Sequence, residues 1–195
     1  MTTATAKTDG RVARRQGTRE SIMEAATELF AARGVTSTSI DDIAEAAGIA
    51  KGSIYYNFES KAGLVEAILA RSSELLSAAL AEAQAGRSGR DLQASIVREL
   101  LVLLKAHPDA AQVMVTELFR TERSWREAIQ NWRALAVAPL IADMEASGVP
   151  QDRARLRAAA IVGATLTAGL EWLVFHPELA ASAVTDAVLE TLGLS

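Results

Sequence analysis

The chain has 195 residues, of which 50% are hydrophobic and 23% are charged, and its formal net charge is −4. This length holds one medium domain or two smaller ones, and the composition excludes a chain that is disordered throughout. Cysteine is absent, which excludes disulfide bridges, thiolate nucleophiles and cysteine metal sites.

The charge is unevenly distributed along the chain. Residues 1–63 hold eight basic and eight acidic side chains, so the remaining 12 basic and 16 acidic residues supply the whole negative charge. A phosphate backbone attracts positive charge, and the net charge alone therefore argues against a nucleic-acid partner. The neutral first third weakens that objection.

Neither a membrane segment nor a metal site is expected. No uninterrupted apolar run approaches the roughly 20 residues that cross a bilayer, and the first 17 residues lack the apolar region of a signal peptide. His107 and His176 lie far apart and each precedes a proline, so we interpret both as structural residues. We therefore expect a cytoplasmic protein with no membrane partner, no metal and no cofactor.

Residues 1–17 are polar and carry four basic side chains, which predicts a flexible basic N-terminal arm; an ordinary irregular terminus has the same composition. From Thr18 onward the apolar residues recur with the period of a helix, and strand signals are scarce. The chain is therefore predicted to be all-α. The first helix is expected from Thr18 to Arg33, with Gly34 as its C-terminal stop.

Two short helices are expected next. Ser39 is a favourable N-cap, and Asp42 places a carboxylate where the helix dipole favours it. Gly48 ends this helix, and another begins near Lys51 and stops near Phe58. This spacing is typical of a helix-turn-helix, here at about 39–58. Seven apolar residues can form its core against the first helix: Ile40, Ile43, Ala44, Ala47, Ile49, Ile54 and Phe58.

The last of these helices has an exposed face of unusual composition. A major groove admits one helix, whose N-terminal residues reach base edges. Lysine can donate to guanine or phosphate, glycine permits a close approach, and tyrosine can contact thymine methyls and phosphate oxygens. The alternative is that the two tyrosines are half-buried packing residues between helices. The face consists of Lys51, Gly52, Ser53, Tyr55, Tyr56 and Asn57.

The stretch from residue 18 to residue 69 reads TRESIMEAATELFAARGVTSTSIDDIAEAAGIAKGSIYYNFESKAGLVEAIL. It resembles the DNA-binding domain of the TetR family of bacterial transcriptional regulators almost position by position. The resemblance covers about the first third of the chain; the later helices match the family in number and length, not in residues. It implies a DNA-binding domain at 18–63 and a helical ligand-binding and dimerisation domain at 64–195.

The resemblance also implies roles for single residues. Ala50 stands where the family usually has a serine or threonine that caps the recognition helix, so one hydrogen bond is expected to be missing. Asn57 replaces the commoner histidine and is expected to keep a polar contact to the DNA backbone. The family's phosphate contacts fall on Thr38 or Ser39, on Tyr56 and on Lys61, and its base-proximal positions fall on Lys51, Gly52, Ser53 and Tyr55.

Beyond Ser60 the periodic segments are longer. Pro139 predicts a kink or a new helix start inside one of them. The expected helices cover residues 60–85, 91–106, 108–116, 118–147, 153–175 and 178–192.

The last two predicted helices are candidates for a dimer interface. Small residues on the helix at 153–175, such as Gly163 and Ala164, allow a close backbone approach, and the final helix repeats apolar residues at heptad-like spacing. Two copies would form a four-helix bundle across a two-fold axis. An intramolecular core face is the alternative.

Large side chains in otherwise alanine-rich helices are candidates for the pocket of a small, largely apolar effector, although each is also an ordinary core residue. Glu117, Glu171 and His107 could orient such a ligand, but a surface position is the default for all three. The candidate pocket residues are Met114, Phe119, Trp125, Trp132, Trp172 and Phe175.

These patterns predict a homodimeric, ligand-responsive transcriptional repressor that binds a palindromic operator in double-stranded DNA. An enzyme needs a nucleophile–base pair, a metal set or a phosphate loop, and the sequence shows no such motif. A helical adaptor that binds only proteins would leave Lys51, Tyr55 and Lys61 unexplained. We therefore expect a regulator and not an enzyme, with the adaptor and the enzyme as the alternatives.

Overall fold

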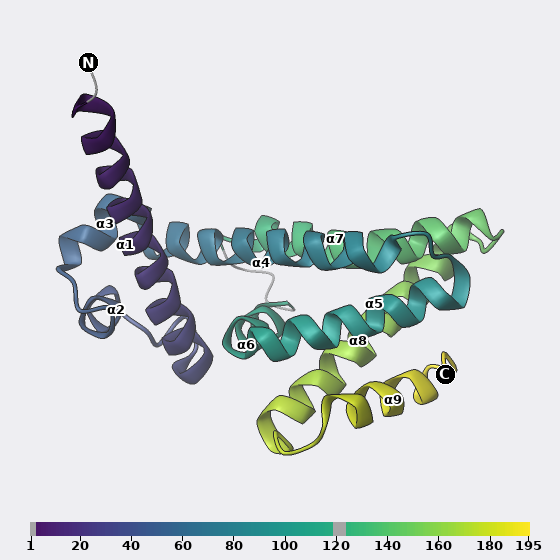
Figure 1. Cartoon of the computed structure of the whole chain (residues 1–195). Coiled ribbons are helices and arrows are strands. Elements are labelled where there is room, and N and C mark those ends of the chain that lie inside the picture. Colours follow the sequence, from purple (N-terminus) through teal and green to yellow (C-terminus); the bar gives the residue numbers. More distant parts are fainter. Residues whose placement is uncertain (1–2, 119–123) are drawn as a thin grey trace. The chain divides into compact units, whose positions relative to one another are not determined.

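The computed structural model describes residues 3–118 and 124–195, with side chains from Arg15 onward, and these ranges are helical without a strand (Figure 1). The all-α prediction is confirmed. The chain divides into two compact units, Met1–Ile68 and Leu69–Ser195. The division falls inside a helix, five residues beyond the boundary expected from the sequence.

The first unit holds α1 (Thr3–Arg33), α2 (Ile40–Ala46), α3 (Lys51–Phe58) and the first residues of α4 (Lys61–Gln84). Helix α1 packs against α2, and α2 packs against α3. Their shared core includes Ile22, Ile43 and Ile54, which have no exposed surface. Of the seven core residues expected in the helix-turn-helix, Ala47 and Ile49 are only half-buried.

The N-terminus differs from the expected flexible arm. Residues 3–17 are helical and continue without a break into the first predicted helix, so that α1 starts at Thr3. Elongation of an existing helix adds one hydrogen bond for each residue that is fixed, whereas nucleation is costly. The segment between Gly10 and Gly17 is therefore able to extend α1, because most of its residues are tolerable helix formers.

The short helices α2 and α3 are bounded by specific backbone geometry. Ser39 and Asp42 form the predicted cap of α2, in which each side chain accepts a hydrogen bond from the other residue's backbone N–H. Gly48 has φ +65°, a conformation that favours glycine, and it follows the end of α2. Glu59 has φ 57° directly after α3, which ends that helix.

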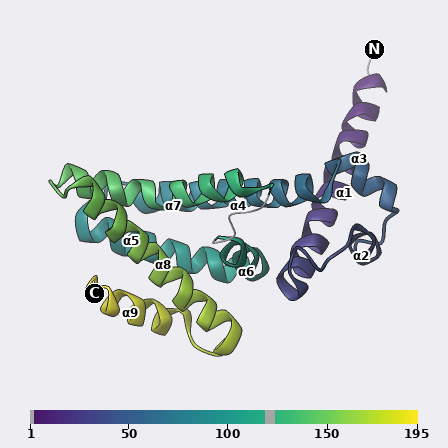
Figure 2. The ribbon, with the colours of Figure 1, turned by 180° about the vertical axis from the view of Figure 1, so that it is seen from behind.

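The second unit is a bundle of longer helices, with α8 in contact with four others (Figures 1 and 2). Pro139 lies inside α7, so it does not start a new helix there. Gly169 of α8 lies so close to Leu104 of α5 that a Cβ atom would meet its side chain. The helices of this unit are the rest of α4, then α5 (Gly89–Ala106), α6 (Pro108–Glu117), α7 (Arg126–Ala146), α8 (Gln151–Phe175) and α9 (Ala181–Thr191).

Helix α8 is long and apolar enough to span a membrane by length and composition, with a mean hydropathy of 1.6 over its best 18 residues. The core helix of a globular bundle meets the same criterion. Contacts of α8 with α5, α6, α7 and α9 fit that second description, so the hydropathy of α8 carries no argument for a membrane.

Candidate nucleic-acid interface

Helix α3 presents an exposed face that contains two tyrosines. Tyr55 is 46% exposed and Tyr56 is 72% exposed, while Ile54 and Phe58 are buried in the first unit. Lys51 and Gly52 are also exposed, and Ser53 is half-buried. The tyrosines are thus more accessible than the packing alternative requires. Of the six residues expected on this face, Lys51, Gly52, Tyr55 and Tyr56 are exposed.

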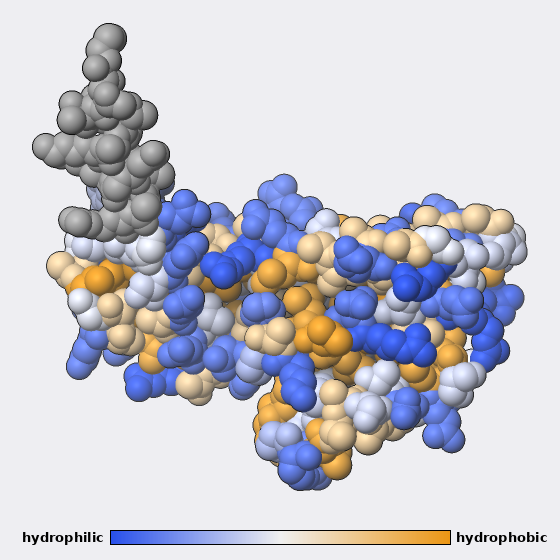
Figure 3. Space-filling view, in the orientation of Figure 1, coloured by the Kyte–Doolittle hydropathy of each residue, from blue (hydrophilic) through white to orange (hydrophobic). Residues whose placement is uncertain are grey.

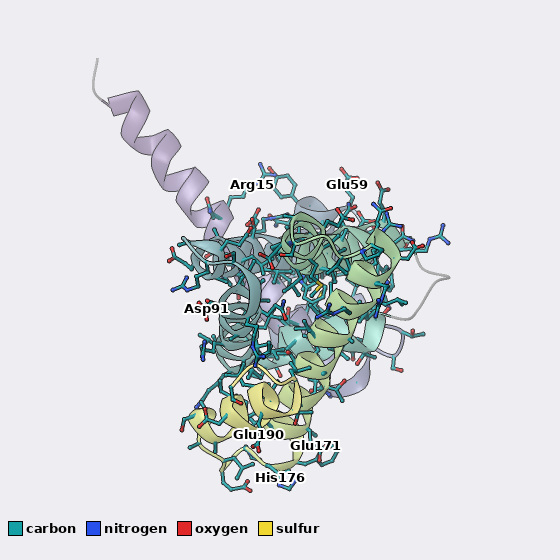
Figure 4. All side chains as sticks on the ribbon, turned by 90° about the vertical axis from the view of Figure 1, so that its right-hand side faces the viewer. Arg15, Glu59, Asp91, Glu171, His176 and Glu190 are labelled. Atoms are coloured by element: carbon teal, nitrogen blue, oxygen red, sulfur yellow. The ribbon has the colours of Figure 1, made fainter. Side chains whose placement is uncertain are left out.

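Two arginines of α1 hold the C-terminal end of α3. The guanidinium of Arg19 lies 4.3 Å from the centre of the Phe58 ring and donates to the backbone oxygen of Asn57 at 2.9 Å. That of Arg15, labelled in Figure 4, lies 5.2 Å from the centre of the Tyr56 ring. Sequence reasoning missed both residues, because a basic residue on a surface helix carries no signal of the partner it will meet.

Asn57 is turned back onto its own helix. Its Nδ2 donates to the backbone oxygen of Ser53 at 2.8 Å. Its Oδ1 is buried and has no hydrogen-bond partner within the part of the chain that the structure describes. The side chain expected to point to solvent and to contact the DNA backbone is therefore engaged inside the first unit.

The two residues predicted for a phosphate contact at the start of α2 differ in accessibility. Thr38 is 1% exposed, and its hydroxyl donates to the backbone oxygens of Gly34 at 3.0 Å and Leu29 at 3.3 Å. Ser39 is exposed and caps α2. Of the two, Ser39 is the one that a phosphate could reach.

Lys61 also has partners inside the first unit. Its Nζ donates to the backbone oxygen of Val35 at 2.8 Å and to that of Thr38 at 2.9 Å. An ammonium group has three N–H donors, so one donor remains for a phosphate oxygen. Lys61 therefore joins the start of α4 to the loop before α2, whatever contact it makes outside the protein.

Lys51, the first residue of α3, is paired with α2. Its Nζ lies 2.8 Å from Oδ2 of Asp41, and both side chains are substantially exposed. The hydrogen bond with Asp41 raises the pKa of Lys51 above its ordinary value. The pair lies at the N-terminal end of α3, where a groove-binding helix makes its base contacts.

Residues 22–68 match the family model described as bacterial regulatory proteins, tetR family. This segment of the chain is therefore similar to the TetR family. The match runs from the middle of α1 to the first residues of α4. It therefore includes all residues of the candidate interface except Arg15 and Arg19.

Named transcriptional regulators are similar to part of the chain. The HTH-type transcriptional regulator AcrR of Shigella flexneri is 39% identical over 87 residues, which are 45% of this chain and 40% of AcrR. TtgR of Pseudomonas putida is 52% identical over 54 residues, which are 28% of this chain and 26% of TtgR. The HTH-type transcriptional repressor KstR2 of Rhodococcus jostii is 46% identical over 55 residues, 28% and 27% of the two chains. The matched segments thus span well under two thirds of these relatives.

Solved structures match over most of the chain. A TetR-like transcriptional regulator from Rhodococcus sp. RHA1 has a TM-score of 0.74 at 26% identity, covering 90% of this chain and 92% of its own. FadR from Bacillus subtilis, solved in complex with stearoyl-CoA, has a TM-score of 0.71 at 20% identity and covers 89% and 96%. The second likeness shows the fold alone. The helical second unit therefore shares the fold of these regulators, although its amino acids differ from theirs at most positions.

The residues predicted for an effector pocket do not form one cluster. Met114 and Trp132 line a cavity of about 40 Å³ together with His107 and Ser72. Trp172 donates from Nε1 to the backbone oxygen of Leu179 at 3.0 Å and lines a separate groove. The remaining candidates lie elsewhere: Trp125 is buried against Glu117, Phe175 is 66% exposed, and Phe119 lies outside the described residues.

The three polar residues that could orient a ligand also lie apart from one another. Glu117 is 2% exposed, so the surface position assumed for it is wrong, and its Oε2 accepts from Nε1 of Trp125 at 3.1 Å. His107 is half-buried beside the cavity. Glu171 is exposed and lies near His176 at the end of α8, 3.7 Å from its Nε2 (Figure 4).

An exposed apolar groove runs between α8 and α9. It measures about 300 Å³ and is lined by small and apolar residues that include Ala164, Ala168 and Ala183. Figure 3 shows hydrophobic residues among hydrophilic ones on the surface where α8 ends and α9 begins. Among the residues that the structure describes, Gly163 has no neighbour that a Cβ atom would meet, so packing against them does not require its small size.

Proposed function

We propose that this chain is a sequence-specific DNA-binding transcriptional regulator, and that it acts as a repressor. The observation that carries the proposal is the exposed face of α3, where Lys51, Gly52, Tyr55 and Tyr56 stand on a helix whose inner face is buried. The named relatives, including the repressor KstR2, support the same activity.

The proposed contacts follow from accessibility. Lys51, Gly52, Ser53 and Tyr55 face base edges in the major groove, where lysine donors and apolar ring surfaces discriminate between base pairs. Tyr56 and Ser39 contact phosphates, and Lys61 contributes through its third N–H. Arg15 and Arg19 act as positioning residues, because they contact the aromatic rings at the end of α3.

The proposed regulator is a homodimer that forms across α8 and α9. The apolar groove between these helices and the exposed Val174, Phe175 and Leu179 would be covered by the same surface of a second copy. A two-fold symmetric dimer presents two recognition helices about 34 Å apart or a multiple of it, so the operator is palindromic. Analytical ultracentrifugation tests the dimer, and a monomer at micromolar concentration contradicts it.

We also propose that a small, largely apolar effector binds in the second unit and releases DNA. The cavity lined by Met114, Trp132 and Leu166 is apolar, with His107 and Ser72 as polar groups that could orient a ligand. Its volume of about 40 Å³ is far below the roughly 300 to 1,000 Å³ of ordinary ligand sites. Binding would therefore widen it and move the surrounding helices, among them α4, which continues into the first unit.

Such a switch needs only modest differential affinity. A ligand that prefers the DNA-incompetent state about 100-fold shifts the equilibrium by about 2.7 kcal/mol. By reciprocity, operator DNA weakens effector binding by the same factor. Calorimetry with and without operator duplex tests this once an effector is found, and equal affinities in both titrations contradict it.

The deciding experiment for the function is selection of bound sequences from random duplexes with the purified chain. The proposal expects enrichment of one palindromic sequence, bound with a strong dependence on salt. Lys51→Ala should weaken binding to the selected site, and Arg133→Ala, an exposed basic residue of α7, is the matched loss of charge outside the interface. No enrichment, or equal losses for both variants, contradicts the proposal and favours an adaptor or an enzyme. In the proposal the protein acts in the cytoplasm on chromosomal DNA and catalyses no reaction.

A further inference from the structure

The ion pair between Lys51 and Asp41 has no evident structural purpose. Asp42, not Asp41, forms the capping box of α2 with Ser39. An ion pair between exposed side chains contributes only about 0 to 1 kcal/mol to stability. The pair nevertheless ties the first residue of the proposed recognition helix to an acidic residue, on a surface that the proposed function brings against a polyanion.

The geometry of the pair matches one edge of a base pair. Lys51 Nζ and Asp41 Oδ2 are a hydrogen-bonded donor and acceptor 2.8 Å apart. In the major groove, guanine presents O6 and N7 as acceptors and its cytosine partner presents the N4 amino group as a donor. Guanine O6 and cytosine N4 are themselves hydrogen-bonded to each other, so they stand about 2.9 Å apart. A donor and an acceptor at that spacing can address both bases at once.

We propose that Asp41 is a specificity-determining residue that reads one G·C base pair jointly with Lys51. This inference rests on the proposed function. Lys51 donates one N–H to Asp41 and uses the other two for O6 and N7 of guanine. The carboxylate of Asp41 accepts from N4 of the paired cytosine. Because Lys51 keeps its partner throughout, the bases are read by an already oriented ammonium and carboxylate.

The same pair lowers the affinity for DNA of any sequence. A free lysine that contacts a phosphate releases a counterion and adds about 0.9 to the slope of binding against salt. While Lys51 is paired with Asp41, that contact would replace one anion by another and leave a carboxylate beside the phosphates. Asp41 therefore disfavours phosphate contacts and favours the G·C edge, which is how discrimination against wrong sites arises.

The test measures base preference and random-sequence binding for Asp41→Ala, with Glu45→Ala as the matched control. Glu45 is an exposed carboxylate of the same helix, so both variants remove one negative charge from α2. The wild type should prefer G·C over A·T at one position of each half-site about tenfold. Asp41→Ala should reduce that preference to threefold or less, bind random duplex about tenfold more tightly, and steepen its salt slope by about one unit. Glu45→Ala should keep the base preference.

A double-mutant cycle tests whether Asp41 acts through Lys51. In a Lys51→Ala background the G·C preference at this position should be gone. Adding Asp41→Ala should not restore it and should not produce the one-unit increase in salt slope, because no lysine is released to contact a phosphate. Asp41→Leu, which keeps the approximate size of the side chain but has no hydrogen-bond acceptor, serves as a second variant and should also lose the preference. Circular dichroism on all variants checks that the helices are intact.

The outcomes separate the inference from the proposed function. If Lys51→Ala loses the preference and both Asp41 variants keep it, lysine reads the base alone and the inference is overturned while the function stands. If Glu45→Ala loses it equally, the effect is one of total charge and the inference is again overturned. If the wild type prefers no sequence at all, the proposed function fails and the inference falls with it.

Discussion

The two units differ in how much the junctions between their helices depend on polar side chains. In the first unit, polar side chains bond to backbone oxygens at the junctions between short helices: Thr38 to Gly34 and Leu29, Lys61 to Val35 and Thr38, and Arg19 to Asn57. In the second unit Trp172 bonds to the backbone oxygen of Leu179 between α8 and α9, and buried Glu117 bonds to the side chain of Trp125. The long helices pack against one another largely through apolar side chains.

The difference follows from helix length. Helices α2 and α3 have seven and eight residues, too few to be stable alone, so side chains must hold the turns between them. The helices of the second unit have up to 25 residues and can be joined by packing of their apolar faces. The first unit thus depends on particular polar residues, and the second depends on volume and pattern.

Glu117→Ala is the largest perturbation that we expect, and it tests whether the second unit depends on its own polar contact. Loss of the carboxylate leaves the indole N–H of Trp125 buried without this acceptor and opens a void, which should cost about 3 kcal/mol of unfolding free energy. Denaturant unfolding measures it. Glu117→Gln, which keeps an acceptor and the volume, should cost less than about 1 kcal/mol. Equal stability of Glu117→Ala and wild type would show that volume and pattern suffice.

Gly63→Ala tests the backbone geometry at the junction of α3 and α4. A Cβ atom at this position would meet the backbone oxygen of Phe58, which cannot move without shifting the end of α3. We expect the first unit to lose about 1 to 3 kcal/mol of stability, the usual cost of overpacking. Amide hydrogen exchange should rise in α2 and α3 and remain unchanged in α8. Faster exchange in both units would mean that they do not unfold independently.

The helices themselves were largely predictable from the sequence. Expected and observed bounds agree within about three residues for every helix after the first except α7, because apolar periodicity and glycine stops specify them. Helix α3 was predicted at its observed bounds. The missing side-chain cap at Ala50 was also predicted correctly. The long N-terminal extension of α1 was not, because two glycines and a polar composition indicated a flexible segment.

Side-chain partners were much less predictable. Nothing local to Lys61 indicates that it bonds to carbonyls 23 and 26 residues earlier, and nothing local to Glu117 indicates burial. Such contacts depend on which helices meet, and hydrophobic periodicity gives the face of a helix but not its neighbour. For the same reason, of the five proposed pocket residues that the structure describes, only Met114 and Trp132 line the same cavity.

Gly52→Ala separates folding from DNA binding within the first unit. A Cβ atom at Gly52 would meet no atom within 4 Å, and alanine in place of a helical glycine adds about 0.5 to 1 kcal/mol of stability. If α3 enters the groove as proposed, the same methyl group should weaken binding to the selected site. A higher melting temperature with lower affinity is the expected combination. Unchanged affinity would show that the backbone at Gly52 does not approach DNA closely.

The smallest expected effect concerns the cap of α2 and its dependence on pH. Hydrogen bonds to Asp42 from the side chain and then the backbone of Ser39 lower the pKa of this carboxyl below its ordinary value of 3.8. A carboxyl with a depressed pKa in the folded state stabilises the fold above its unfolded pKa, and this contribution is lost as the pH falls through the folded pKa. The melting temperature of Asp42→Asn should therefore lie below that of the wild type at neutral pH.

The difference in melting temperature between the wild type and Asp42→Asn should narrow once the pH falls below about 4, where carboxyl groups begin to take up protons. Ser39→Ala is the matched control, because it removes the hydroxyl that makes the larger contribution to the pKa shift. In that background the substitution of Asp42 should have a smaller and flatter effect on the melting temperature between pH 7 and about pH 3. A gap that stays constant down to the lowest pH would show that the charge of Asp42 does not act through this cap. The first unit would then depend on the geometry of its turns alone.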